Sequence, residues 1–136
     1  MNRELRFRAW YKYQKQMKEV FSLDFVNRKA YIEINKFQVP FGYIHFDDCE
    51  LMQYTGVKDN TEEETEIYEG DNIKFMYNDI EFIGEVKFEG GCFILCNYDL
   101  PDSYIPLLEI IDSDREYFFI DGEVVSNIYE KQLNNI

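Results

Sequence analysis

The sequence lacks the features that would place the chain in or across a membrane. No apolar run reaches the ~18 residues that a membrane-spanning helix requires, so we expect no membrane contact. The start of the chain also lacks the apolar core of a signal peptide. These two absences predict a soluble cytoplasmic protein.

Cysteine is scarce, and its three residues make an odd count. Cys92 and Cys96 would share one face of a predicted strand at a separation of ~13 Å, beyond the ~7 Å limit between Cα atoms for a disulfide. We therefore expect both to be small buried apolar residues. Together with Cys49, they are predicted to stay reduced without an intramolecular bridge.

Motifs of catalysis and cofactor binding are missing as well. The sequence holds no phosphate-cradling glycine loop, no nucleophile elbow and no zinc-binding helix. A cysteine nucleophile would need a basic partner, and His45 is the single histidine. These absences disfavour an enzyme, and we predict no cofactor.

Two sets of residues have the right chemistry for a metal but the wrong arrangement. His45, Asp47 and Cys49 alternate, yet the first and last of them would lie ~13 Å apart on a strand, too far for one tetrahedral ion. The second set falls at positions 1, 3, 5 and 12 of a calcium loop and consists of Asp112, Asp114, Glu116 and Glu123. Tyr117 stands where that loop needs glycine, so no metal site is predicted.

Basic residues are few and unevenly distributed. The chain has 14 Lys and Arg against 27 Asp and Glu, a formal net charge of −13. Residues 1–40 carry nine basic and four acidic residues, about +5, whereas residues 41–136 carry five and twenty-three, about −18. Such an acidic field repels phosphate backbones over most of the surface, which disfavours nucleic acid as a partner.

Aromatic residues, in contrast, are abundant. Eleven Tyr and twelve Phe contribute to a sequence that is 46% hydrophobic, enough to fill the core of one domain or of two small ones. Aromatic and β-branched residues favour strands. The composition therefore predicts a mainly β protein, either all-β or β-rich α+β.

The first 49 residues are predicted to form an N-terminal β subdomain. Leu5, Phe7 and Ala9 alternate with Arg6 and Arg8, which is strand periodicity with a positive outer face. A hairpin loop and a helix close behind it should follow this strand. The loop is expected at residues 12–16, and further strands at 21–25, 30–34 and 43–46.

Residues 51–75 are expected to organise the later part of the chain, a domain covering residues 50–136. A short strand at 51–54 should end in a Thr55-Gly56 turn, and residues 61–66 should form a charged loop. Glu69-Gly70-Asp71 should then make a sharp corner, because Gly70 accepts a positive φ and Asp71 can bond the backbone two residues on.

Beyond this corner the strand signal is strongest. Three consecutive strands at 71–77, 80–88 and 92–98, joined by turns at 78–79 and 89–91, predict an antiparallel meander. Further elements are expected near the end of the chain. They are a strand at 107–111, a hairpin of 117–120 with 124–128 about Asp121-Gly122, and a helical turn at 129–133.

Four segments carry a resemblance to a known family. They are Arg6-Phe7-Arg8-Ala9-Trp10, residues 51–59, residues 67–75 with Ile67-Tyr68-Glu69-Gly70-Asp71, and Asn127-Ile128-Tyr129-Glu130. In this order they resemble the YopX family of phage and prophage proteins. The resemblance implies a mainly β fold with a small SH3-like barrel in the later part, and a setting in a bacterial host cell. It implies no activity.

The leading hypothesis is therefore a non-enzymatic accessory protein that binds a host or phage protein or serves in assembly. Aromatic-rich loops and strand edges would supply the contacts, and such edges also predict self-association into a homo-oligomer. The candidate interaction surface consists of Arg6, Arg8, Trp10, Tyr54, Tyr68 and Asp71.

Two alternatives remain open. In the first, a basic N-terminal face contacts nucleic acid beside an exposed Trp10 or Tyr11. This face consists of Arg3, Arg6, Arg8, Lys12, Lys15 and Lys18. In the second, the acidic surface imitates nucleic acid and blocks a host protein that binds it. Internal pairing of the basic residues with carboxylates of the chain argues against the first alternative.

Overall fold

The structure is a computed structural model that describes residues 4–38, 40–112, 115–119 and 121–130, with backbone only for residues 115–119. The described residues form thirteen strands and two 3-10 helices, so the prediction of a mainly β protein is confirmed. The strands are β1 Phe7–Tyr11, β2 Gln16–Asp24, β3 Lys29–Glu33, β4 Phe41–His45, β5 Cys49–Lys58, β6 Glu66–Tyr68, β7 Asp71–Tyr77, β8 Ile80–Glu89, β9 Cys92–Cys96, β10 Tyr104–Pro106, β11 Ile111–Asp112, β12 Arg115–Phe119 and β13 Gly122–Asn127. The 3-10 helices are η1 Phe46–Asp48 and η2 Leu107–Ile110.

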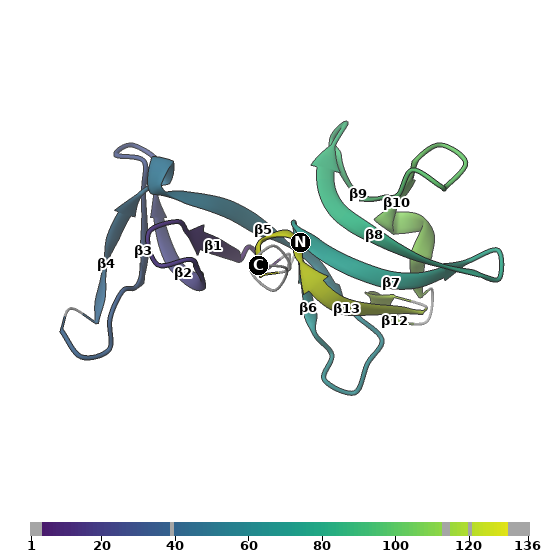
Figure 1. Ribbon diagram of the computed structural model, residues 1–136, viewed down its shortest axis with the longest axis horizontal. Coiled ribbons are helices and arrows are strands. Elements are labelled where there is room, and N and C mark those ends of the chain that lie inside the picture. The colour runs from purple at the N-terminus through teal and green to yellow at the C-terminus, as the bar shows by residue number, and fades with distance from the viewer. Residues whose placement is uncertain (1–3, 39, 113–114, 120, 131–136) are drawn as a thin grey trace. The chain divides into compact units, whose positions relative to one another are not determined.

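The chain divides into two compact units (Figure 1). The N-terminal unit comprises Glu4–Gln53, and the C-terminal unit comprises the described residues from Tyr54 onward. The sequence-based division into domains 1–49 and 50–136 stays a prediction. None of the helical segments in the described part of the chain has the length and apolar character that crossing a membrane requires.

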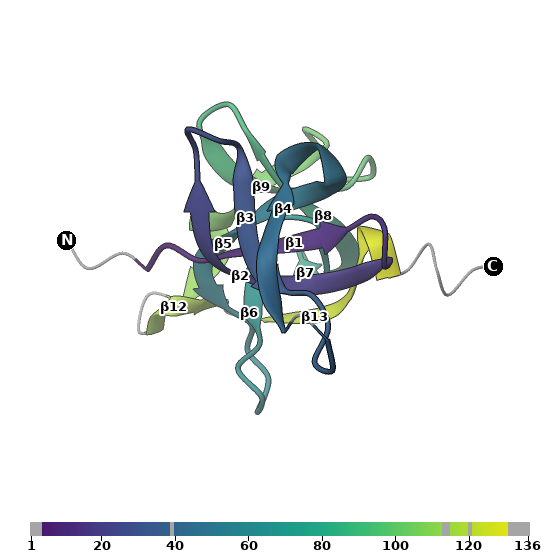
Figure 2. The same ribbon diagram turned by 90° about the vertical axis from the view of Figure 1, so that its left-hand side faces the viewer.

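The N-terminal unit is an antiparallel sheet in the order β5-β1-β2-β3-β4, and β2, β3 and β4 lie side by side (Figure 2). Its apolar cluster lies on one face, where small residues predominate. The buried members are Ala9, Ala30, Ile32, Ile44 and Cys49. Ala9 is thus on the inner side of β1 and Arg8 on the other, as the alternation predicts.

The helix predicted behind the first hairpin is wrong, because β2 is a strand of nine residues. The hairpin turn itself is confirmed at residues 12–15. Met17 and Val20 fit a helical spacing, but each has a cross-strand partner on β1, namely Trp10 and Phe7. Pairing on both sides, with β1 and with β3, outweighs a local pattern of this kind.

The C-terminal unit is built on an antiparallel sheet in the order β10-β9-β8-β7-β13. The predicted meander is confirmed, and its turns have the positive φ that such hairpins need at Asn78, Asp79, Gly90 and Gly91. Large residues fill the core under this sheet. They are Val57, Ile67, Ile73, Phe75, Val86, Leu95, Leu100, Ile105 and Leu107. The SH3-like barrel stays a prediction, since the described pairing runs as an open path from β10 to β13.

Two boundaries differ from the sequence prediction. Thr55-Gly56 is no turn: β5 continues through it, and its pairing with β6 shifts register between Tyr54 and Lys58. Gly56 has φ +87°, so it makes a bulge that bends the strand without ending it. The strand expected at 107–111 is mostly the 3-10 helix η2, which begins directly after Pro106.

The hairpin predicted around Asp121-Gly122 lies partly outside the described residues. Its second strand, β13, pairs with β7, and the described pairings of β12 are with β11 and with β5. Helical backbone follows β13 at residues 128–130, where the sequence predicts one turn of helix from 129. The side chain of Asn127 accepts hydrogen bonds from the Tyr129 and Glu130 N–H groups and so caps that turn.

Candidate functional site

The six residues of the predicted interaction surface are divided between the two units. Arg6, Arg8 and Trp10 belong to the N-terminal unit, and the other three to the C-terminal unit. Arg6 is exposed and lies 3.3 Å from the carboxylate of Glu4, whereas Arg8 is half-buried. Trp10 is only 7% exposed, so the expectation of an exposed Trp10 is wrong. A buried indole cannot stack on a nucleobase.

The three residues of the C-terminal unit contact one another next to the corner at Gly70. Tyr54 and Tyr68 are cross-strand partners whose ring centroids are 5.4 Å apart. Asp71 is 2% exposed, and its carboxylate accepts a 2.8 Å hydrogen bond from the Tyr68 N–H. This bond runs back three residues along the chain. Gly70 has φ +87°, as predicted. These residues, which lie in the segments that carry the family resemblance, therefore have a structural role.

A second buried carboxylate, Asp59, was not singled out by the sequence pattern. It is 1% exposed. One oxygen accepts from the Thr65 N–H at 2.9 Å and from the Thr61 hydroxyl at 2.7 Å. The other accepts from the Val124 N–H of β13 at 3.0 Å. Asp59 thus links the loop between β5 and β6 to β13, where Val124 lies 65 residues later in the sequence. A local sequence pattern cannot reveal this contact.

The first of the two residue sets with metal-ligand chemistry forms the ends of a 3-10 helix. His45 Nδ1 accepts from the Asp47 N–H at 3.1 Å, and Cys49 Sγ lies 3.7 Å from the Phe46 carbonyl oxygen, so these residues make the ends of η1. Among the described residues, no group of three or more ligand residues is placed to hold an ion. The calcium-loop set includes Asp114, which lies outside them.

The cysteines correct one expectation. Cys49 is buried and Cys96 half-buried, but Cys92, the first residue of β9, is exposed. Burial raises the pKa of the Cys49 and Cys96 thiols above the ordinary value. Thiols of this kind are poor nucleophiles at neutral pH.

The feature that sequence reasoning missed is a continuous aromatic surface on the outer face of β2, β3 and β4. We call it the aromatic face, and it consists of Phe21, Tyr31, Phe41 and Tyr43. Phe21 contacts Phe41 edge to face at 5.5 Å, and Tyr31 contacts Phe41 at 6.0 Å and Tyr43 at 4.9 Å between ring centroids. Phe21, Phe41 and Tyr43 are 52%, 43% and 54% exposed. Their exposed rings form a patch of the kind found at protein interfaces.

The aromatic face borders an open strand edge. The Ile34 N–H donates to the Pro40 carbonyl, and the Phe46 N–H to the Arg28 carbonyl. Hydrogen-bonded residues alternate along an antiparallel ladder, so between these points Gly42 and Ile44 bond to β3. Phe41, Tyr43 and His45 consequently point their backbone N–H and C=O groups away from β3. In the part of the chain that the structure describes, the sheet ends there, at β4.

The composition of β4 and the structure on either side of it favour an accessible, regular strand edge. β4 contains no Lys, Asp, Glu or Pro, the residues that commonly protect an exposed edge. At one end of the aromatic face, Phe21 also borders a hollow of about 470 Å³ that reaches the loop at Phe37. At the other end, the β2–β3 turn is held by hydrogen bonds from Asn27 to Asp24, which lower the pKa of the Asp24 carboxyl.

A sequence signal for the aromatic face exists in retrospect. In β3 and β4, aromatic residues alternate with small or aliphatic ones: Tyr31 lies between Ala30 and Ile32, and Gly42 separates Phe41 from Tyr43. Alternation shows that two faces differ. It does not show which face is covered, since both kinds of residue are apolar.

The comparisons with known proteins concern the whole chain. It is similar to protein EF1440 from Enterococcus faecalis, with 23% identity, a TM-score of 0.61, and coverage of 96% of this chain and 97% of that one. It is also similar to protein yopX from Bacillus subtilis, with 17% identity, a TM-score of 0.57, and coverage of 92% and 93%. At these identities the likeness establishes the fold alone. No curated protein matches the sequence significantly. The model of the YopX protein family, however, matches residues 6–133, from β1 past the cap at Asn127, and the chain therefore belongs to the YopX family.

Proposed function

We propose that this chain is a non-enzymatic protein-binding module of a phage or prophage, and that its N-terminal unit binds an extended segment of a host or phage protein along β4. The observation that carries the proposal is the aromatic face beside an open, uncharged strand edge. An added strand would bond to the backbone of Phe41, Tyr43 and His45, and its alternate side chains would cover the aromatic rings.

The charge distribution supports a protein partner over nucleic acid. Residues 4–53 carry eight basic and seven acidic residues, about +1, so this unit has no strong field for phosphate. Several of its cations also have carboxylate neighbours: Arg6 lies 3.3 Å from Glu4, Lys12 lies 3.4 Å from Glu50, and Arg28 lies 3.3 Å from Asp47. Exposed pairs of this kind contribute little stability, about 0–1 kcal/mol, yet they reduce the charge left for phosphate.

The first test compares lysine substitutions of two tyrosines in the same unit. Tyr43→Lys places a charge on the aromatic face, and Tyr13→Lys places one in the first hairpin loop, where Tyr13 is 87% exposed. We expect affinity capture from nuclease-treated bacterial lysate to recover the same proteins with wild type and Tyr13→Lys, and to lose them with Tyr43→Lys. Equal capture by all three, or no capture by wild type, would contradict the proposal. Capture that disappears on nuclease treatment would favour the nucleic-acid alternative.

A second test isolates the backbone of the edge. His45 has φ −72°, which proline adopts without strain, so His45→Pro removes only an outward N–H and the imidazole. His45→Ala removes the imidazole alone. We expect His45→Ala to retain capture and His45→Pro to weaken it about tenfold, the order of one charge-free hydrogen bond plus the steric cost of the ring. Equal behaviour of the two variants would show that the strand edge is not used.

A further inference from the structure

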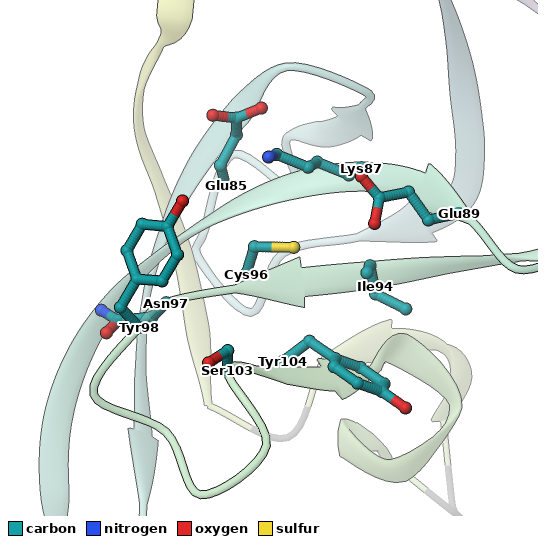
Figure 3. A pocket seen from close by; sticks show the side chains of 9 residues that line it. All are labelled: Glu85, Lys87, Glu89, Ile94, Cys96, Asn97, Tyr98, Ser103 and Tyr104. Carbon is teal, nitrogen blue, oxygen red and sulfur yellow. The ribbon is translucent and has the colours of Figure 1, made fainter.

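The C-terminal unit carries a hollow that the proposed function does not use. It has a volume of about 340 Å³ and lies on the outer face of β8, β9 and β10, opposite the core (Figure 3). Three strands build it in register: Glu85 faces Cys96 and Cys96 faces Tyr104, while Lys87 faces Ile94. A volume near the lower end of the ~300–1,000 Å³ range of ligand sites suits one side chain with its adjoining backbone.

The walls and floor of the hollow have different chemistry. Cys96 and Ile94 form an apolar floor between the β8 side chains and Tyr104, and Tyr98 stands at one end (Figure 3). Tyr98 is 93% exposed, so its ring has open faces and little packing of its own. Glu85 and Glu89 place two carboxylates along the β8 side, with Lys87 between them.

We infer that this hollow binds an arginine side chain of a partner protein. The methylene stem of arginine would cover the apolar floor at Ile94 and Cys96, and the planar guanidinium would stack on a tyrosine ring and donate to Glu85. The net negative charge of the C-terminal unit favours a cationic side chain, because residues 54–136 contain twenty acidic and five basic residues. Lys87 is the competing cation, and no ion pair within 4 Å is described for it.

The test uses the full chain and two blocked tripeptides, acetyl-Gly-Arg-Gly-amide and acetyl-Gly-Gln-Gly-amide, in an NMR titration near 0.15 M salt, where the Debye length is about 8 Å. We expect the arginine peptide to shift the amide signals of Cys96, Tyr98 and Tyr104 along a saturable curve. The glutamine peptide should leave them in place. Failure of the arginine peptide to shift these signals, or equal shifts with both peptides, overturns the inference.

Four variants locate the binding. Glu85→Gln and Tyr98→Ala should each weaken it by up to about fivefold, as expected for a partly exposed ion pair or cation–π contact. Lys87→Gln should strengthen it, since it removes the competing cation. The control is Glu63→Gln, which changes the net charge equally at an exposed position of the loop at residues 61–65. If Glu63→Gln weakens binding as much as Glu85→Gln, the attraction is diffuse and the assigned site is wrong.

Discussion

The two units of this chain differ in where they place their large apolar side chains. The apolar cluster of the N-terminal unit is built from two alanines, two isoleucines and a cysteine, whereas the four rings of the aromatic face lie on its outer side. The C-terminal unit buries Ile, Leu, Val and Phe in a cluster of nine residues, and its surface is strongly acidic.

The difference indicates that one unit contributes mainly stability and the other mainly a binding surface. Burying large side chains contributes about 1.5–3 kcal/mol apiece, so the C-terminal unit should be the more stable. The N-terminal unit leaves large aromatic side chains on its surface, where a partner can still cover them. Trp10, the single tryptophan, lies in the N-terminal unit, so its fluorescence reports on that unit, whereas circular dichroism reports on both.

The largest effect is expected for Asp59→Ala, at about 4 kcal/mol of unfolding free energy. The substitution leaves the Thr65 and Val124 N–H groups buried without their acceptor, at a cost of about 1–3 kcal/mol each, and frees the Thr61 hydroxyl. Asp59→Asn, which keeps one carbonyl oxygen, should cost less. Urea denaturation followed by circular dichroism measures both, and a loss below about 1 kcal/mol for Asp59→Ala would refute the structural role of this carboxylate.

A matched pair of core substitutions tests whether the two units differ in stability. Ile32→Ala and Ile73→Ala each remove a fully buried side chain, one from each cluster, and should each cost about 3 kcal/mol. We expect the Trp10 fluorescence transition in urea to move with Ile32→Ala only. If Ile73→Ala shifts that transition equally, the two units unfold together and are not separate in stability.

A smaller effect is expected at the corner between β6 and β7. Gly70 has φ +87°, and it joins two backbone bonds, donating to the Val86 carbonyl and accepting from the Ile128 N–H. Gly70→Ala should therefore cost about 1–2 kcal/mol of strain. Gly70→Asn should cost less, because asparagine adopts positive φ more readily. Thermal unfolding that ranks Asn below Ala would contradict this account.

The smallest effect is expected from chemical modification of the three cysteines, which requires no substitution. Iodoacetamide at neutral pH should modify Cys92 first, Cys96 next and Cys49 last, because burial hides the latter two thiols and raises their pKa. Raising the pH should accelerate all three, with the larger relative gain at Cys49 and Cys96, whose thiolate forms appear only at higher pH. Peptide mass spectrometry over time follows each site, and equal rates for Cys92 and Cys49 would disprove the burial of Cys49.

Local sequence determined most of the strands and turns. The meander from β7 to β9 follows from alternating apolar residues and from Asn78-Asp79 and Gly90-Gly91, which accept the positive φ of tight turns. The corner at Gly70 and the family resemblance also depend on residues that are adjacent in the chain. Each of these features is set within a few residues, where steric preference acts.

The tertiary structure alone decided what each side chain contacts. Trp10 is buried and Phe41 exposed, although both are aromatic residues in strands with alternating patterns. Asp59 reads as one more acid beside a charged loop, yet it is buried against a strand 65 residues away. Likewise, β4 becomes an open edge only because of the order in which five strands pair. Burial and edges arise from long-range pairing, and no local spacing of residues encodes which face or which strand is left uncovered.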